Sequence, residues 1–274
     1  MNDAPRTAPV LRWPGGKRRM LPQLLPLIDH SRTLYCEPFA GGLALLLAKE
    51  RHRAEVVNDL NGDLVALYRC AQFHLEALIG EFEFILGSRS NLADMKAQPG
   101  LTDLQRAARF LAVNRCSFAG NHSTFAVSRT SPGVSSRANV VSALRALNAR
   151  LDRVAVEHLP WQRCVSLYDS PGTLFFLDPP YLAADTHIYR GWREADMEEL
   201  AAALDGLRGT WLLTVDDSAF NRALFGRHHL TPVTTRNGLA KNAARAVFGE
   251  LIIRPRSPEE ERAAAAGARR KKAA

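Results

Sequence analysis

Short apolar runs alternate with helical patterns in two separate parts of the chain. In the first part, an extended run (33–37), an apolar helical stretch (43–50) and a second extended run (55–59) together predict a βαβ unit. In the second part, the pattern predicts strands at 154–157, 173–177, 210–215 and 246–253, and helices at 197–207 and 218–225. Strands that alternate with helices predict an α/β fold, in which helices cover both faces of an open, mostly parallel sheet.

Residues 81–152 interrupt this alternation. Helical patterns at 102–113 and 139–151 flank a stretch, 116–136, that is rich in Gly, Ser, Thr and Asn. The segment is also rich in arginine, with Arg106, Arg109, Arg115, Arg129, Arg137, Arg145 and Arg150. It is therefore either a helical cap with solvated arginines or a surface that binds phosphates.

These patterns predict the domain organisation of the chain. We expect one discontinuous main domain of residues 1–80 and 153–256. A mainly helical insertion of residues 81–152 would interrupt it, and residues 257–274 would form a flexible basic tail.

Composition and charge narrow the classes of protein that fit. The 274 residues are 46% hydrophobic and 23% charged, with a formal charge of +8 and a pI near 9.7. This excess of positive charge favours a polyanionic partner, with nucleic acid as the first candidate. The apolar runs are far shorter than the roughly 20 residues that cross a bilayer. Since residues 1–10 also lack the apolar core of a secretory signal, we expect a cytoplasmic protein that is not embedded in a membrane.

The four cysteines give no sign of a metal site or a disulfide framework. Cys36, Cys70, Cys116 and Cys164 are far apart and show no C-x-x-C spacing. We therefore expect a reducing compartment and no bound metal.

The strongest chemical signal is Asp178-Pro179-Pro180-Tyr181, which directly follows the apolar run 174–177. Ligands of open α/β sheets gather at the carboxyl ends of strands. Prolines stiffen the backbone, so the carbonyls of Asp178 and Pro179 can face a ligand beside the Asp178 carboxylate and the Tyr181 ring. Such a cluster suits the amino group of a planar heterocycle, which would donate to Asp178 and to a backbone carbonyl. The alternative is a strand-terminating turn, but this combination arises by chance in only about one in a thousand chains.

A second signal joins a glycine turn to an acid at the end of the next strand. In the segment 35–42, Gly41 and Gly42 lie between a predicted strand and helix, where they would let the backbone approach a ligand. Asp59 follows about 20 residues later, where nucleoside-binding sheets place a carboxylate for ribose hydroxyls. The pair indicates an adenosine-containing cofactor, with helix capping by Asp59 or Asn61 as the alternative.

A third signal lies near the N-terminus, in the segment Trp13-Pro14-Gly15-Gly16-Lys17. The tight turn holds an indole and an ammonium group on either side. By itself, this pattern fits a surface turn with a buried tryptophan as well as a ligand site.

Taken in order, the segments 13–17, 37–42, 58–61 and 178–181 resemble the motifs of the Dam-like (class alpha) DNA adenine methyltransferases. The similarity spans most of the chain, and the family's target-recognition insertion lies where residues 81–152 lie here. Residues 249–253 are also similar to a terminal strand of the family. The resemblance implies a Rossmann-like methyltransferase sheet that uses S-adenosylmethionine and acts on double-stranded DNA. It also suggests a cognate restriction endonuclease as a partner, and we expect the protein to be a monomer.

The resemblance also implies roles for individual residues. The positions that match the family's cofactor contacts are Trp13, Lys17, Asp59 and Asp178, and we also expect Glu37, Phe39 and Gly41 to bind the cofactor. The catalytic group would be Asp178, Pro179 and Tyr181. Asp178 and the Pro179 carbonyl would accept the hydrogens of the target amino group and stabilise the charge it gains, while Tyr181 would stack on the extruded base.

Two departures from the family pattern change what can be expected. Leu43 stands where many members have a third glycine, which would narrow the cofactor turn. In the insertion, residues 119–123 replace the Asn-Gly-Leu-x-Arg run of members that read GATC, so we do not predict GATC specificity. We expect the contacts with DNA to come from Arg115, Asn121, His122 and Arg129.

The sequence also bears on activities other than DNA adenine methylation. A cytosine carbon-5 methyltransferase needs a nucleophilic cysteine, typically after proline, and no cysteine here follows a proline. Methyltransferases of glutamine or RNA with a related Asn-Pro-Pro-Tyr motif lack the early turn at 13–17 and the basic insertion. Methylation of the cytosine amino group, and a catalytically inactive DNA-binding protein of the same fold, stay open as alternatives. The intact motif residues favour an active enzyme.

Overall fold

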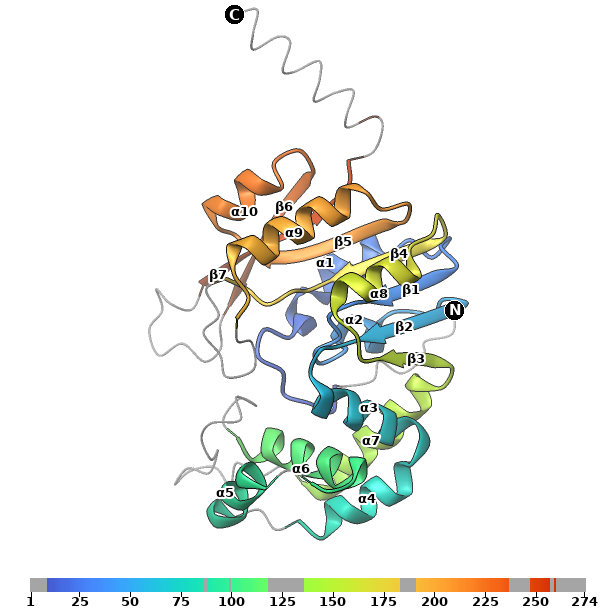
Figure 1. Cartoon of the computed structure of the whole chain (residues 1–274), viewed down its shortest axis with the longest axis vertical. Coiled ribbons are helices and arrows are strands. Elements are labelled where there is room, and N and C mark those ends of the chain that lie inside the picture. The colour runs from blue at the N-terminus through green and yellow to red at the C-terminus, as the bar shows by residue number, and fades with distance from the viewer. Residues whose placement is uncertain are drawn as a thin grey trace, which may run out of the picture.

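A seven-stranded sheet forms the centre of the protein (Figure 1). The computed structural model describes residues 9–85, 88–98, 100–117, 136–182, 191–236, 247–256 and 259. The strands are β1 (Leu34–Glu37), β2 (Ala54–Asn58), β3 (Val154–Glu157), β4 (Thr173–Leu177), β5 (Thr210–Asp216), β6 (His229–Arg236) and β7 (Val247–Arg254). Their order is β3-β2-β1-β4-β5-β7-β6; the first five pair in parallel, and β7 pairs antiparallel with both β5 and β6. The prediction of an α/β fold with a mostly parallel sheet is thus confirmed.

Helices connect these strands and pack on both faces of the sheet. The described helical segments are η1 (Lys17–Met20), α1 (Leu21–Leu24), η2 (Leu25–Leu27), α2 (Ala44–Ala48), α3 (Gly62–Phe73), α4 (Leu75–Glu83), α5 (Arg89–Ala97), α6 (Asp103–Cys116), α7 (Arg137–Leu151), α8 (Trp161–Tyr168), α9 (Glu194–Asp205) and α10 (Ala219–Leu224). The predicted βαβ unit corresponds to β1, α2 and β2, and the six strands predicted from the apolar runs all form. Strand β6 was not predicted, because it is a polar edge strand that contains Pro232, a residue tolerated only where a strand has a free edge.

Alternate side chains of the inner strands enter two separate cores. In β4, Leu174 and Phe176 face the core built with α1–α4, α6 and α7, whereas Phe175 and Leu177 face the core built with α8 and α9. All five residues of β4 are buried, as expected for a central parallel strand covered on both sides. This burial fixes the position of the Asp178 loop, which begins where β4 ends.

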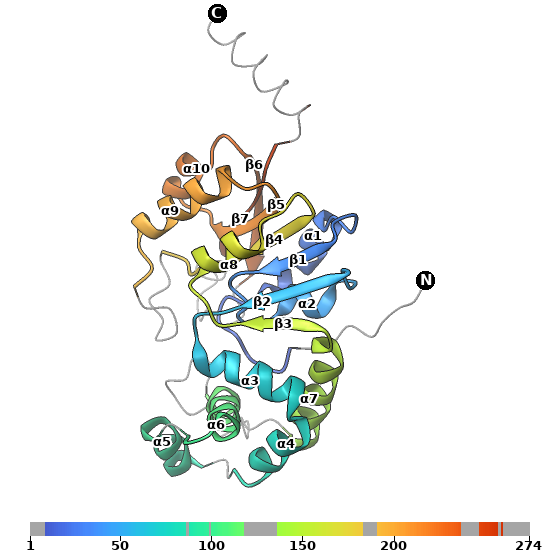
Figure 2. The same ribbon diagram turned by 45° about the vertical axis from the view of Figure 1, so that its right-hand side comes forward.

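Helices α3–α7 form a group beyond β3, at one end of the sheet (Figures 1 and 2). Helix α6 lies against α3, α4 and α5, and α7 packs against α3 and α4. The helices predicted at 102–113 and 139–151 correspond to α6 and α7. Helix α3 ends before residue 81, the predicted start of the insertion, and α4 spans that residue. Both helices pack with α6 and α7 in one continuous core.

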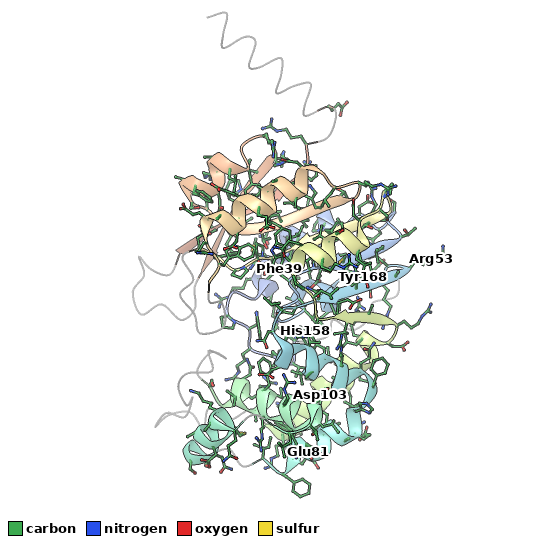
Figure 3. The ribbon with its side chains drawn as sticks, viewed as in Figure 1. Phe39, Arg53, Glu81, Asp103, His158 and Tyr168 are labelled. Carbon is green, nitrogen blue, oxygen red and sulfur yellow. The ribbon has the colours of Figure 1, made fainter. Side chains whose placement is uncertain are left out.

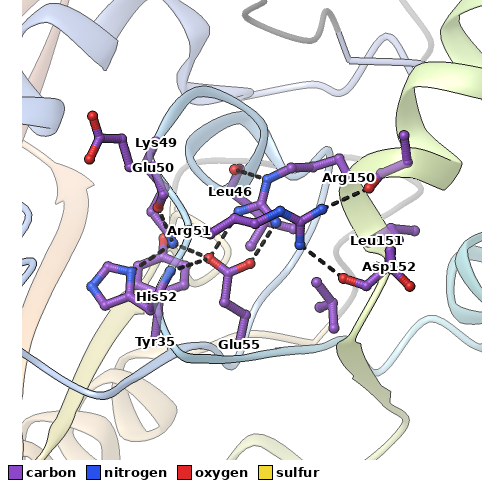
Figure 4. Close-up of polar contacts among 12 residues, drawn as sticks. Tyr35, Leu46, Lys49, Glu50, Arg51, His52, Glu55, Arg150, Leu151 and Asp152 are labelled. Carbon is purple, nitrogen blue, oxygen red and sulfur yellow. Dashed lines mark hydrogen bonds and ion pairs between the residues drawn. The ribbon is translucent and has the colours of Figure 1, made fainter. Parts of the chain in front are cut away.

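A buried ionic cluster ties the end of α7 to the sheet (Figure 4). Arg150 donates to both carboxylate oxygens of Glu55 on β2, at 2.5 and 2.9 Å, and to the Leu46 carbonyl at 3.0 Å. Lys49, at the end of α2, also pairs with Glu55 and lies over the Tyr35 ring. Removing one partner of such a pair would leave a buried charge uncompensated, which is strongly destabilising. The cluster therefore fixes how helices α3–α7 join the sheet.

No helix in the described part of the chain is long and apolar enough to cross a membrane. The four cysteines are free and buried.

Candidate active site

A cavity of about 490 Å³ opens at the carboxyl ends of β1, β2 and β4. This is the position at which open α/β sheets bind ligands. Every residue expected to contact the cofactor lines this cavity, namely Trp13, Lys17, Glu37, Phe39, Gly41, Asp59 and Asp178. Segments separated by more than 160 residues of sequence therefore meet at one site.

The Trp13 side chain packs directly on the glycine turn that follows β1. Gly41 has a φ of 45°, and a Cβ atom there would lie 2.8 Å from Trp13 Nε1. At Gly42, a Cβ atom would lie 2.9 Å from Trp13 Cβ. Because real side chains do not fit at these distances, both positions need glycine for Trp13 to pack on the turn. Trp13 is thus a half-buried wall of the cavity and not a residue of an isolated surface turn.

Leu43 occupies a position of this turn whose backbone conformation favours glycine. Its backbone is left-handed, with φ 57° and ψ 28°, a conformation that costs a non-glycine residue about 1 kcal/mol or more. Its side chain is 1% exposed and packs in the core, which offsets that cost. The same conformation delays the helix predicted from residue 43, so that α2 begins at Ala44.

Asp59 connects the glycine turn to the start of α3. Its two carboxylate oxygens accept hydrogen bonds from the backbone N–H groups of Gly41 and Asn61, each at 2.9 Å. Burial raises the pKa of Asp59, while these backbone donors lower it. The capping alternative applies to Asn61, whose side chain accepts from the N–H groups of Asp63 and Leu64. Asp59 itself stays available to a ligand as a cavity-lining acceptor.

Glu37 is the most deeply buried acid of the cavity wall. It is 1% exposed and accepts a hydrogen bond of 2.7 Å from the Tyr35 hydroxyl. Burial raises the pKa of Glu37 to about 7, against the opposing effects of the Tyr35 hydrogen bond and the Lys49 charge. A carboxyl group with such a pKa responds to any cation that enters the cavity.

Asp178 is held by two side chains at one of its oxygens. Lys17 Nζ lies 2.7 Å from Oδ1, and the Thr214 hydroxyl donates to the same atom at 2.8 Å. Lys17 also donates to the Gly15 carbonyl at 2.8 Å, which fixes the ammonium group against its own turn. Burial raises the pKa of Asp178, whereas Lys17 and Thr214 lower it. Both contacts from described residues fall on Oδ1, so a ligand can be met by Oδ2.

The rest of the Asp-Pro-Pro-Tyr loop flanks this carboxylate. Pro180 lines the cavity, while the ring of Pro179 is buried behind it. The Lys17 ammonium lies 4.7 Å from the centroid of the Tyr181 ring, and the Tyr181 hydroxyl donates to Glu250 at 2.6 Å. Glu250 was not predicted as a site residue. Its signal was an acid that directly precedes the apolar run Leu251–Ile253 in a strand.

An aromatic wall closes the cavity on the side of α8 and α9. Phe39 (labelled in Figure 3) meets Trp192 edge-on at 5.6 Å between ring centroids and Trp161 at 6.2 Å. Trp161, Trp192 and the exposed Leu60 line the cavity, and none of them was predicted. Neither tryptophan stands in a recognisable motif, and a tryptophan at the start of a helix is typical of core packing.

Helix α6 contacts the Trp13 turn directly. The fully buried Asn114 exchanges two hydrogen bonds with the backbone of Arg12, both at 2.9 Å. Phe110, one turn earlier, lies 6.4 Å from the Trp13 ring. Arg115, the one predicted DNA contact within the described residues, is half-buried on α6 and is not part of the cavity wall; Asn121, His122 and Arg129 lie outside the described residues.

The charge of the cavity is opposite to that of the whole chain. Glu37, Asp59, Asp178 and Asp196 line it together with a single lysine, Lys17, among the described residues. A chain with a formal charge of +8 thus has an acidic ligand site. Such a site suits a cationic ligand and disfavours a ligand rich in phosphate.

The sheet order and this cavity fit an α/β methyltransferase. Comparison with known proteins makes the assignment specific, since the D12 class N6 adenine-specific DNA methyltransferase family matches residues 13–237. The chain belongs to this family and is an adenine-specific DNA methyltransferase. Membership of this family identifies the target as the adenine amino group and not the cytosine amino group. It also identifies the protein as an enzyme and not as an inactive DNA-binding protein.

Three curated relatives agree with this assignment. The Type II methyltransferase M1.LlaDCHI of Lactococcus lactis subsp. cremoris is 24% identical over 272 residues, which cover 89% of this chain and 94% of the relative. The Type II methyltransferase M.MjaIII of Methanocaldococcus jannaschii is 27% identical over 41% of this chain and 46% of its own. The DNA N-6-adenine-methyltransferase of Escherichia phage P1 is 32% identical over 40% of this chain and 15% of its own.

Proposed function

We propose that the cavity binds S-adenosylmethionine and that Asp178 presents the amino group of an extruded adenine to it. The observation that carries the proposal is the acidic, aromatic-walled cavity that ends at the Asp178 carboxylate. Its volume of about 490 Å³ suits a ligand of nucleoside size. When bound, the cofactor supplies an electrophilic methyl group on a positively charged sulfur.

The residues of the cavity would divide the recognition of this cofactor among them. Asp59 would accept from the ribose hydroxyls, using the lone pairs that its backbone donors leave over. Phe39 would contact the adenine ring of the cofactor, and Glu37 would favour its positive charge. Trp13 and Gly41 would shape the turn that lies against it.

Asp178 and the Pro179 carbonyl would act on the target base. Accepting the two hydrogens of the adenine amino group localises the nitrogen lone pair and aims it at the methyl group. The same acceptors stabilise the positive charge that the nitrogen gains in the transition state. Lys17 would hold Asp178 through Oδ1, and Tyr181 would stack on the base with the ring face opposite Lys17.

Double-stranded DNA would be read by the helical insertion. Arg115, Asn121, His122 and Arg129 are the proposed contacts, with residues 81–152 as the recognition domain. Helices α3 and α4 pack with α6 and α7, which supports counting them in the same structural unit. The Type II names of relatives support a cognate restriction endonuclease as a partner of this methyltransferase.

The cofactor assignment is tested by titrating the protein with S-adenosylhomocysteine in a calorimeter. Asp59→Ala should weaken this binding by roughly 10-fold or more, because a hydrogen bond to a charged group is lost, and should weaken DNA binding far less. Asp169→Ala is a matched control, since the Asp169 carboxylate also accepts two backbone N–H groups, those of Arg208 and Gly209, away from the cavity. Equal weakening of cofactor and DNA binding in Asp59→Ala would refute the ribose assignment.

A further inference from the structure

Tyr181 is held at two points by residues from distant parts of the chain. Its hydroxyl donates to Glu250 Oε2 at 2.6 Å, and the Lys17 ammonium lies over its ring, 4.7 Å from the centroid. Glu250 is 69 residues away in sequence, and its side chain is only 12% exposed. The far end and one face of the ring are therefore both fixed.

The direction of β7 explains how Glu250 reaches the site. Strand β7 runs antiparallel to β5, and Glu250 pairs with Asp216 at the carboxyl end of β5. The beginning of β7 therefore lies at the same edge of the sheet as the carboxyl end of β4, from which the Asp178 loop starts. The last strand thus delivers a carboxylate to a site otherwise built from parallel strands.

The hydroxyl of Tyr181 is suited to act as a permanent donor in this contact. Desolvation raises the pKa of Tyr181 well above its ordinary value, and the carboxylates of Asp178 and Glu250 raise it further. The phenol therefore keeps its proton at physiological pH. Without an acceptor at its far end, a tyrosine ring in a loop can leave its position by rotation about its side-chain torsions.

We propose that Glu250 is a positioning residue for methyl transfer, which holds the Tyr181 ring by its hydroxyl in the orientation that stacks on the extruded adenine. This inference rests on the proposed role of Tyr181 in stacking. Glu250 also lies 3.7 Å from Lys17, but Lys17 is much closer to Asp178, at 2.7 Å. The hydrogen bond to Tyr181 is thus the principal contact between Glu250 and the catalytic loop.

Variants at the two ends of the hydrogen bond between Tyr181 and Glu250 test its role. Glu250→Ala and Tyr181→Phe remove the two ends of one hydrogen bond, so each should lower kcat roughly 10-fold. The double variant should also fall only roughly 10-fold, because the second change has nothing left to remove. Glu250→Gln keeps an acceptor for the hydroxyl and should retain most of the wild-type kcat.

The test measures methylation kinetics on unmethylated genomic DNA, with S-adenosylhomocysteine affinity and the thermal midpoint as further readouts. The single variants should lower kcat with cofactor affinity changed less than about twofold. Glu157→Ala is the matched control, because Glu157 accepts from the Tyr168 hydroxyl (Tyr168 is labelled in Figure 3) outside the cavity; it should leave kcat unchanged.

Each contrary outcome is distinguishable. An unchanged kcat in Glu250→Ala, independent effects that multiply in the double variant, or a folded Glu250→Gln that is as slow as Glu250→Ala would each overturn the inference. Tyr181→Ala separates this from the proposed function. If Tyr181→Ala keeps full activity, the stacking role itself fails, whereas a slow Tyr181→Ala beside an unaffected Glu250→Ala contradicts only the role of Glu250.

Discussion

Glu37 shows how a single residue of the cavity wall links function to stability. An acid whose pKa is raised in the folded state contributes fully to stability below its unfolded pKa, near 4.5, and this contribution is lost as the pH rises through about 7. The cost of burying Glu37 is therefore felt most at neutral and alkaline pH. A cation in the cavity would relieve part of this cost, since it favours the carboxylate.

We predict that Glu37→Gln removes this pH dependence. From pH 5 to pH 8, the free energy of unfolding of the wild type should fall by about 2 kcal/mol more than that of the variant. Urea unfolding at the two pH values measures the difference. Parallel pH profiles of the two proteins would show that Glu37 titrates normally in the folded state.

The residues that carry family motifs could be predicted from the sequence, whereas Glu250 could not. Asp178, Lys17 and Asp59 stand in short, recognisable segments, and the structure brings all three to one cavity. Glu250 reaches that site only because β7 runs antiparallel beside β5. Such a reversal of strand direction is a property of the whole sheet and leaves little trace in a local pattern.

At the scale of elements, the strands and helices that could be predicted are those with a clear hydrophobic pattern. The fully buried strand β4 and the strand β3 were predicted with the observed bounds. Helix α8 was missed, although its first residue, Trp161, walls the cavity, because its eight residues offer little more than two turns of pattern. The start of α2 was misplaced by one residue, because the left-handed Leu43 looks like helix in an apolar run.

The contact between α6 and the Trp13 turn leads to a prediction for Asn114→Ala. The variant leaves the Arg12 N–H and carbonyl without their partner, so the Trp13 wall should loosen and S-adenosylhomocysteine should bind several-fold more weakly. Asn148→Ala is a matched control on α7, because Asn148 also donates to backbone carbonyls of a neighbouring helix, those of Ala71 and Gln72.

Calorimetric titration of both asparagine variants, alongside their thermal midpoints, checks this prediction. Both should lose stability, by about 1–3 kcal/mol. Only Asn114→Ala should lose cofactor affinity. An equal loss of affinity in Asn148→Ala would mean that general destabilisation, and not the Trp13 turn, is responsible.

Across the whole molecule, the net charge is opposite in sign to the charge of the cavity wall. The formal charge is +8, while the described wall of the cavity is acidic. A positively charged chain attracts the phosphates of DNA, whereas the acids of the cavity wall would favour a cationic cofactor. If at least three cationic side chains contact phosphates, DNA affinity should fall by at least about 40-fold between 50 and 200 mM salt.

Fluorescence anisotropy with labelled duplex DNA across this salt range measures the slope. The affinity for S-adenosylhomocysteine, measured in the same buffers, should change little, because the cavity holds its ligand by contacts that salt screens weakly. DNA affinity that is independent of salt would contradict a phosphate-binding role for the basic insertion.

The most direct test of the account is the transfer of a labelled methyl group from S-adenosylmethionine to unmethylated duplex DNA, followed by digestion to nucleosides. The wild type should place the label in N6-methyladenine. Asp178→Ala, with an unchanged circular dichroism spectrum, should place less than about one hundredth as much, because the acceptor that aims the amino group is lost. Label in methylated cytosine, or a folded Asp178→Ala that methylates adenine at the wild-type rate, would contradict the account.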